Sequence, residues 1–146
     1  MIEYEFWDQK THSGKDAASV NDLLSLLTAA PTIIFLSGLN RLAQNSKLLL
    51  ARDSENSQIV GMATLAIFLV PTGKCGRIED VVVDDGYRRR GIGKTLVKRL
   101  ITEAKKLRLK KIDLTSRPER VAANRLYQTL GFERVKTNPY RLNLKK

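Results

Sequence analysis

The chain has 146 residues, of which 42% are hydrophobic and 28% charged, a balance typical of one globular domain rather than a disordered chain. We expect a single domain over residues 1–146. The longest apolar run, residues 62–70, is too short to cross a bilayer, and the first five residues carry acids where a secretory leader has bases. A soluble, cytoplasmic protein is therefore expected. One histidine and one cysteine predict neither a metal site nor an internal disulfide.

The net charge of +11 is concentrated in the second part of the chain. Residues 1–87 carry 7 bases and 11 acids, whereas residues 88–146 carry 19 bases and 4 acids. Between Arg88 and Lys111, eleven bases accompany a single acid, Glu103. A field of this kind attracts an anionic partner, either a nucleic acid or a phosphorylated cofactor. Charge alone does not choose between them.

The first half of the chain reads mainly as strands, with two helices inserted after the first strand. Apolar residues at spacings of three and four predict the first helix, which Pro31 should end. Cys75, between Gly73 and Gly76, is expected in a turn. The expected elements are strands at residues 3–8, 48–51, 59–70 and 77–83, and helices at 16–29 and within 32–45.

The second half begins with the clearest helix of the chain. From Ile92 to Leu107, apolar residues recur on one side and lysines lie on the opposite side. A short strand is expected at residues 111–115. The spacing of Ser116 and Glu119 is that of a capping box, which predicts a helix from there to Leu130 with Gly131 as its left-handed end. Two final strands are expected, at residues 132–136 and 140–144.

Residues 81–94 combine a strand, a glycine-containing loop and a basic amphipathic helix. A helix start presents unpaired N–H groups and the positive end of the helix dipole, and glycines let a phosphate approach the backbone. Arg88, Arg89, Arg90 and Lys94 add positive charge there. The third glycine of a dinucleotide fingerprint and the Lys-Ser or Lys-Thr ending of a P-loop are missing. The loop therefore predicts an anion site of another kind.

The sequence Arg88-x-x-Gly91-x-Gly93 resembles the cofactor motif of the GNAT acyltransferases. A second block, from Asn124 through Tyr127 to Gly131-Phe132, is similar to that family's Tyr-x-x-x-Gly-Phe region, with a different spacing between Asn and Tyr. The resemblance implies an α/β (α+β) fold whose mixed, mostly antiparallel sheet is flanked by helices, and acetyl-CoA as cofactor. It also implies a cofactor site formed by Val81, Val82, Val83, Arg88, Arg89, Arg90, Gly91, Ile92, Gly93, Lys94, Asn124 and Tyr127.

Acetyl transfer from a thioester to an amine needs a proton acceptor, hydrogen bonds to the oxyanion and a proton donor for the thiolate. By the resemblance, Tyr127 is the donor, at the edge of its helix's apolar stripe; the alternative is a tyrosine that only packs. Glu79 and Asp80 are the candidate substrate-binding carboxylates, and because adjacent strand residues point to opposite faces, one of them should face the substrate. We favour Glu79 as general base, on one face with Val81; the alternative is an ion pair with an arginine such as Arg77.

The acceptor is expected to be a primary amine of a small molecule or peptide. Residues 75–83 resemble the matching strand of glucosamine-6-phosphate N-acetyltransferases, whereas residues 115–123 depart from it, so that substrate is an alternative. Two non-enzyme alternatives are an acetyl-CoA sensor and a basic nucleic-acid-binding module. An aromatic content of 6% without a stacking cluster argues against the latter. A homodimer is left open.

Overall fold

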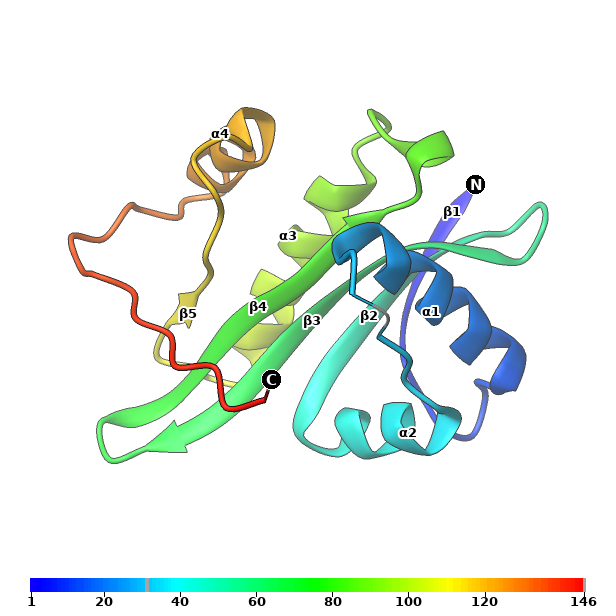
Figure 1. Cartoon of the computed structure of the whole chain (residues 1–146), viewed down its shortest axis with the longest axis horizontal. Helices are drawn as coiled ribbons and strands as arrows, with labels where there is room; N and C mark the ends of the chain where they lie inside the picture. Colours follow the sequence, from blue (N-terminus) through cyan, green and yellow to red (C-terminus); the bar gives the residue numbers. More distant parts are fainter. Residues whose placement is uncertain (31, 146) are drawn as a thin grey trace. The chain divides into compact units, whose positions relative to one another are not determined.

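The computed structural model describes residues 1–30 and 32–145, and the chain divides into two compact units, Met1–Thr115 and Ser116–Lys146. The first unit holds a five-stranded sheet and three helices (Figure 1). In chain order its elements are β1 (Ile2–Phe6), α1 (Gly14–Leu27), α2 (Leu36–Asn45), β2 (Ser46–Asp53), β3 (Gln58–Val70), β4 (Gly73–Val83), a 3-10 turn at Asp85–Tyr87, α3 (Ile92–Lys106) and β5 (Ile112–Asp113).

The strands lie in sequence order across the sheet, so the fold is built from local connections. β1 to β4 form an antiparallel meander, and β5 joins the edge of β4 in parallel after the crossover through α3. Parallel neighbours require such a crossover, because a tight hairpin reverses the chain direction. The expected mixed, mostly antiparallel sheet flanked by helices is confirmed.

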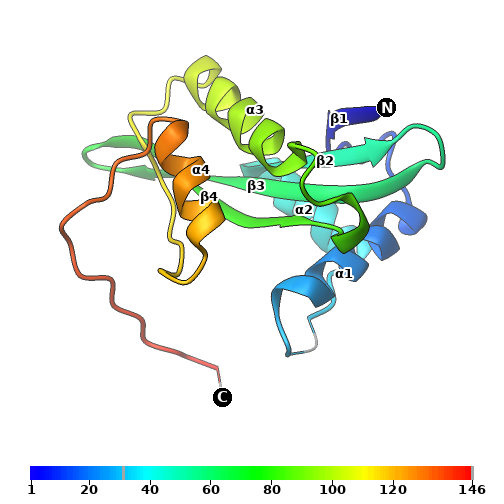
Figure 2. The same ribbon diagram turned by 90° about the horizontal axis from the view of Figure 1, so that it is seen from above.

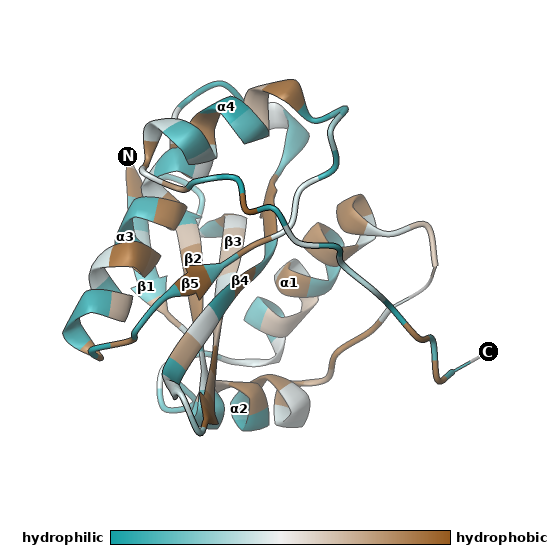
Figure 3. Ribbon diagram, turned by 90° about the vertical axis from the view of Figure 1, so that its left-hand side faces the viewer, coloured by the Kyte–Doolittle hydropathy of each residue, from teal (hydrophilic) through white to brown (hydrophobic). Residues whose placement is uncertain are grey.

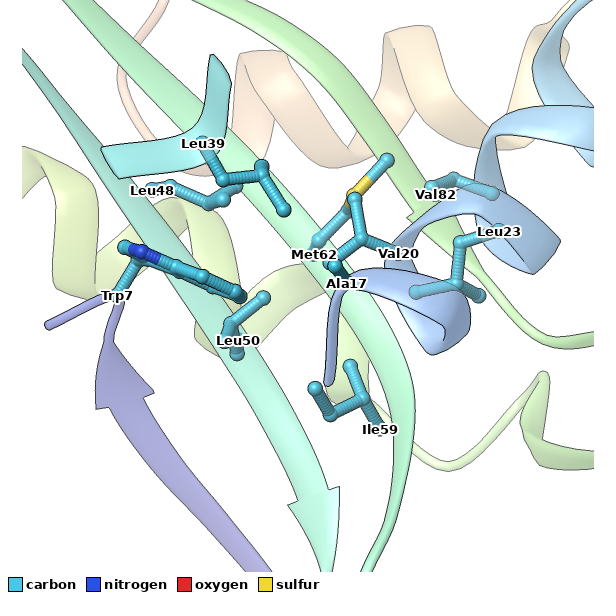
Figure 4. Packing of buried hydrophobic residues seen from close by; sticks show 10 residues of the cluster. All are labelled: Trp7, Ala17, Val20, Leu23, Leu39, Leu48, Leu50, Ile59, Met62 and Val82. Carbon is cyan, nitrogen blue, oxygen red and sulfur yellow. The ribbon is translucent and has the colours of Figure 1, made fainter. Parts of the chain in front are cut away.

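The two faces of this sheet are covered by different helices (Figure 2). α1 and α2 lie on one face, where their apolar side chains join strand residues and Trp7 in one cluster (Figure 4). Trp7 also donates its indole N–H to the side-chain oxygen of Asn40 at 2.9 Å, which ties the end of β1 to α2. The cluster comprises Trp7, Ala17, Val20, Leu23, Leu39, Leu48, Leu50, Ile59, Met62 and Val82.

The opposite face is covered by α3, whose predicted amphipathic pattern is confirmed. Ile92, Leu96, Leu100 and Ala104 are buried, while the lysines of the other side are exposed. Figure 3 shows the resulting alternation of hydrophobic and hydrophilic residues along α3. A Cβ on Gly61 would lie 3.3 Å from Ile92, so this glycine of β3 lets the helix sit close to the sheet. Among the described helices, none has the length and apolar character needed to span a membrane.

The second unit contains α4 (Val121–Thr129), whose end is set by Gly131. Gly131 has a φ of 98°, its N–H donates to the carbonyl of Gln128, and the N–H of Phe132 donates to the carbonyl of Tyr127. This pair of bonds is the Schellman arrangement, in which a left-handed residue, here the expected glycine, satisfies the last carbonyls of a helix. Phe132 then packs edge-on against Tyr127, with ring centroids 6.0 Å apart.

Several expected boundaries are wrong. α4 begins at Val121 rather than after a capping box at Ser116, because Pro118 disfavours helical backbone at the residue before it. The strands expected at residues 132–136 and 140–144 are not formed: residues 116–145 contain no strand. A strand needs a hydrogen-bonded neighbour, and these two segments do not pair with each other. β5 is shorter than expected. The expected role of Pro31 lies outside the described residues.

Cys75 is buried in β4 rather than placed in a turn. The neighbouring Gly76 is required by packing: a Cβ there would stand 2.8 Å from Leu109 and 2.9 Å from Leu65. Gly76 therefore marks a close approach between the sheet and the segment after α3, and reading it as a turn signal was wrong.

Candidate active site

A bulge interrupts the pairing of β3 and β4 at the two candidate carboxylates. Met62 pairs with Val82 and Thr64 with Glu79, so two residues of β4, Asp80 and Val81, stand opposite a single residue of β3. A bulge leaves its extra residue outside the ladder and bends the strand. Asp80 has a φ of 53°, in the left-handed region that is strained for a residue other than glycine. Such strain is found most often at functional sites.

The bulge changes which side chains share a face. Residues directly opposite each other in a ladder lie on the same face, so Glu79 shares the face of Thr64, Met62 and Val82. The simple alternation that put Glu79 with Val81 is wrong, because the extra residue reverses the pattern beyond it. Val81 instead falls on the other side of the sheet, the side covered by α3.

The two carboxylates differ in their surroundings. Glu79 accepts a hydrogen bond from Nε of Arg77 at 3.0 Å. This is the ion pair named in the sequence analysis as the alternative to a general base. Asp80 has no such partner among the described residues. Asp80 is exposed as a residue, but partial desolvation of its carboxyl group raises its pKa, and the negative charge of Glu79 raises it further. Of the two, Asp80 is therefore the carboxylate better suited to accept a proton.

The edge of β4 beyond the bulge is open. β4 pairs with β5 only at Gly76 and Arg77. Within residues 1–115, the segment 78–83 therefore has no strand partner on that side, and its backbone can pair with an extended ligand. The expected cofactor contacts of Val81, Val82 and Val83 would lie on this segment.

The loop from β4 to α3 ends in a helix start whose first N–H groups make no hydrogen bond within the helix. Gly91 has a φ of 76° and precedes the first helical residue, and the first bond within the helix is from the N–H of Thr95 to the carbonyl of Gly91. The N–H groups of Ile92, Gly93 and Lys94 consequently have no acceptor in the helix. Neither a capping side chain nor an acidic residue occupies the first turn. This start fits an anion such as a phosphate.

The four basic residues near this helix start are not equivalent. Arg88 makes an ion pair with Asp85 at 3.0 Å and donates to the carbonyl of Val83 at 3.3 Å. Arg90 lies over the ring of Tyr87, 4.8 Å from its centroid. Arg89, at a φ of 64°, and Lys94 are exposed. The positive charge predicted for this loop is present, but part of it is already engaged within the protein.

Tyr87 of this loop is bonded to Asp53 at the end of β2, and no role was predicted for either residue from the sequence. The hydroxyl of Tyr87 donates to Oδ2 of Asp53 at 2.7 Å and accepts a bond from Asn56 at 3.2 Å. This bond, with a second from the N–H of Glu55, holds the pKa of Asp53 below its ordinary value, and it raises the pKa of Tyr87. The two residues are 34 positions apart, and no periodicity connects them.

In the second unit, Tyr127 is the buried residue of α4, not an edge residue as expected. Its neighbours in the predicted stripe are only half-buried. Burial raises the pKa of Tyr127, with an opposing effect of Arg120, so its phenol stays protonated at neutral pH. The side chain of Asn124 donates to the carbonyl of Arg117 at 2.8 Å, which holds the turn before α4. Among the residues described, no three potential metal ligands are grouped.

The site therefore combines a helix start with unpaired N–H groups, an open strand edge and a carboxylate at a strained bulge, all within an α/β domain. The sequence matches the family described as Acetyltransferase (GNAT) family over residues 20–132. The chain therefore belongs to the GNAT acetyltransferase family. The match extends across both compact units.

Relatives and solved structures agree with this assignment. The chain is 35% identical over 108 residues to the protein named probable glucosamine 6-phosphate N-acetyltransferase 2 of Oryza sativa, covering 66% of this chain and 65% of that one. It is 33% identical over 91 residues to glucosamine 6-phosphate N-acetyltransferase of Schizosaccharomyces pombe, covering 60% and 79%. The crystal structure of an acetyltransferase from Trypanosoma brucei superposes with a TM-score of 0.80 at 29% identity, covering 99% and 100%.

Proposed function

We propose that this protein transfers the acetyl group of acetyl-CoA to a primary amine, with the two units acting as one catalytic domain. The observation that carries the proposal is the start of α3, where three unpaired N–H groups and exposed bases stand next to an open strand edge. When bound, acetyl-CoA supplies an activated acyl group and a thiolate leaving group. Family membership and the named relatives support this activity.

Each part of the site has a distinct task in this proposal. The N–H groups of Ile92, Gly93 and Lys94 hold phosphate, with Arg89 nearby to add positive charge. The backbone of Val81 to Val83 aligns the rest of the cofactor along β4. An N–H near Val81, released from the ladder by the bulge, stabilises the developing oxyanion. Asn124 contacts the cofactor in the family resemblance, although its amide N–H already serves Arg117.

Proton transfer is assigned to two side chains. A carboxylate of the Glu79–Asp80 pair accepts the proton of the amine, directly or through water, and Asp80 is favoured over Glu79 because its pKa is raised and Arg77 engages Glu79. The remaining carboxylate contacts the acceptor. Tyr127 donates a proton to the departing thiolate, a role that fits a phenol kept protonated by burial.

Glucosamine 6-phosphate is a specific alternative acceptor within the proposed function. The observation in its favour is that the rice and fission-yeast relatives are named as glucosamine 6-phosphate N-acetyltransferases. The acceptor screen should therefore place this sugar phosphate beside peptide and small-molecule amines, with released thiol as the signal. If another amine is acetylated and glucosamine 6-phosphate is not, this sugar phosphate is rejected as the acceptor, and the proposed N-acetyltransferase activity stands.

The cofactor site is tested by calorimetry with acetyl-CoA on a matched pair of variants. A Cβ at Gly93 would meet only Val83, at 3.9 Å, so Gly93→Ala should fold and bind. Gly93→Asp places a negative charge among the N–H groups of the helix start and should weaken binding by at least roughly tenfold. Equal affinity of the two variants would remove the helix start from the cofactor site. Binding of duplex DNA but not of acetyl-CoA would favour the nucleic-acid alternative.

A further inference from the structure

The loop between β4 and α3, residues 84–91, is called the anion-binding loop below, and it contains two left-handed residues within three positions. Arg89 has a φ of 64° and Gly91 a φ of 76°. A left-handed arginine costs free energy, and such a conformation persists only where the structure on both sides holds it. On the side of α3, the buried side chain of Ile92 provides that support. The other side of the loop needs an anchor of its own.

Tyr87 is that anchor. It ends the 3-10 turn before the arginines, and its hydroxyl donates to Asp53, the last residue of β2, at 2.7 Å. Asp53 is buried and fixed by a second bond, from the N–H of Glu55 to its Oδ1 at 3.0 Å. A hydrogen bond from a hydroxyl to a carboxylate is stronger than one between neutral groups. The end of β2 and the turn after it thus hold the loop through the Tyr87 hydroxyl, which also accepts a weaker bond from Asn56 at 3.2 Å.

The same tyrosine also positions a base of the loop. The guanidinium of Arg90 lies 4.8 Å from the centroid of the Tyr87 ring, within the range of a cation–π contact. The position of the ring, and with it that of Arg90, depends on where the hydroxyl is held. One hydrogen bond therefore affects both the backbone conformation and the charge placement of the anion site.

We propose that the Tyr87–Asp53 hydrogen bond is a positioning contact that keeps the loop in its anion-binding conformation, so that affinity for acetyl-CoA depends on two residues that do not touch it. This inference rests on the proposed function. Neither residue takes part in proton transfer. The contact should therefore affect cofactor binding and leave the chemical step alone.

The direct test is Tyr87→Phe, which keeps the ring beneath Arg90 and removes the hydroxyl. The Kd and KM for acetyl-CoA should rise by roughly tenfold, because a charge-assisted hydrogen bond that organises the site is lost. The kcat at saturating acetyl-CoA should change by less than about twofold. Tyr4→Phe is the matched control, since an arginine, Arg99, also lies over that ring, at 4.9 Å. It makes the same chemical change away from the loop and should leave Kd unchanged.

A double-mutant cycle with Asp53→Ala, or Asp53→Asn where the alanine variant does not fold, identifies the contact itself. If the two residues act through one bond, the double variant should lose no more affinity than the worse single variant. Backbone amide exchange of residues 85–91 in the protein without cofactor should be faster in Tyr87→Phe than in Tyr4→Phe. This second readout does not depend on acetyl-CoA.

The outcomes separate this inference from the proposed function. A parent protein that does not bind acetyl-CoA overturns the proposed function and the binding half of the inference. If the parent binds and Tyr87→Phe binds equally well, the positioning role is overturned while the proposed function stands. Unchanged amide exchange in Tyr87→Phe overturns the anchor in either case.

Discussion

Asp80 combines two features that each oppose folding. Its backbone is in the left-handed region, and partial desolvation and the adjacent Glu79 raise the pKa of its carboxyl group although the residue is exposed. A residue with a purely structural role would be replaced by glycine or asparagine at little cost. Features that reduce stability are retained where they serve function. These two features favour Asp80 as the group that accepts the proton of the amine in the proposed reaction.

The Asp80→Asn variant separates stability from activity. A raised folded-state pKa means that the native protein loses stability as the pH rises from 3.8 through the raised value, since the folded form binds the proton more tightly. At pH 7.5 the variant should therefore unfold at a higher temperature than the parent, and near pH 3 the gain should vanish. Its turnover should fall by at least about tenfold.

Glu79→Gln provides the comparison for Asp80→Asn. Because the Glu79 carboxylate is paired with Arg77, its removal should not raise the unfolding temperature. If Glu79→Gln loses the turnover and Asp80→Asn retains it, the base is Glu79, as simple alternation first indicated.

Tyr127→Phe tests the proton donor. The change keeps the ring that packs on Phe132 and removes the hydroxyl, so stability should change little. Turnover should fall by at least about tenfold, while the KM for acetyl-CoA should move much less, because the hydroxyl acts mainly in the transition state. Tyr140→Phe, at an exposed tyrosine of the same unit, is the control. A parent-like rate in Tyr127→Phe would make the residue structural.

Elements whose pattern is repeated several times along the chain were predicted well. α3 and β3 were predicted close to their observed ends, because many residues report the same period. Single local signals did worse. One extra residue at Asp80 reversed the alternation of β4, Pro118 overrode the capping box at Ser116, and Gly76 reflects a contact with Leu109, which is distant in sequence.

The candidate site divides in the same way. The glycines and arginines of the loop are contiguous, so their motif was visible in the sequence, whereas the bond between Tyr87 and Asp53 joins segments that only the folded sheet brings together. A sequence signal for such a pair would need the pairing of β2, β3 and β4 to be known first. The role expected for Tyr127 came from resemblance, and its burial could not be deduced from the helical pattern.

Gly76→Ala tests the packing between β4 and the segment after α3. The added Cβ would stand 2.8 Å from Leu109 and 2.9 Å from Leu65, so both side chains must shift. We expect a loss of about 1–3 kcal/mol in the free energy of unfolding, measured by denaturant titration. Gly93→Ala, where the nearest atom is 3.9 Å away, should cost less. Equal stability of the two variants would contradict the close approach at Gly76.

At the scale of the whole molecule, charge is divided as the sequence indicated. The net charge of the chain is +11, and in the first unit exposed bases occupy the loop at Arg88 to Arg90 and continue along α3. Only the first turn of a helix contributes strongly to anion binding. We expect the bases beyond that turn to act at longer range, by raising the rate at which the negatively charged cofactor of the proposed function meets the protein.

The burial of Cys75 has a practical consequence for following this protein in solution. It is the sole sulfhydryl of the chain, and 1% of its surface is exposed. A reagent that counts sulfhydryls should therefore register none per folded molecule and one per unfolded molecule. In an assay of the folded protein, the same reagent should therefore detect released coenzyme A without a background signal from the protein. In a partly unfolded sample without acetyl-CoA, it should report the fraction of unfolded molecules.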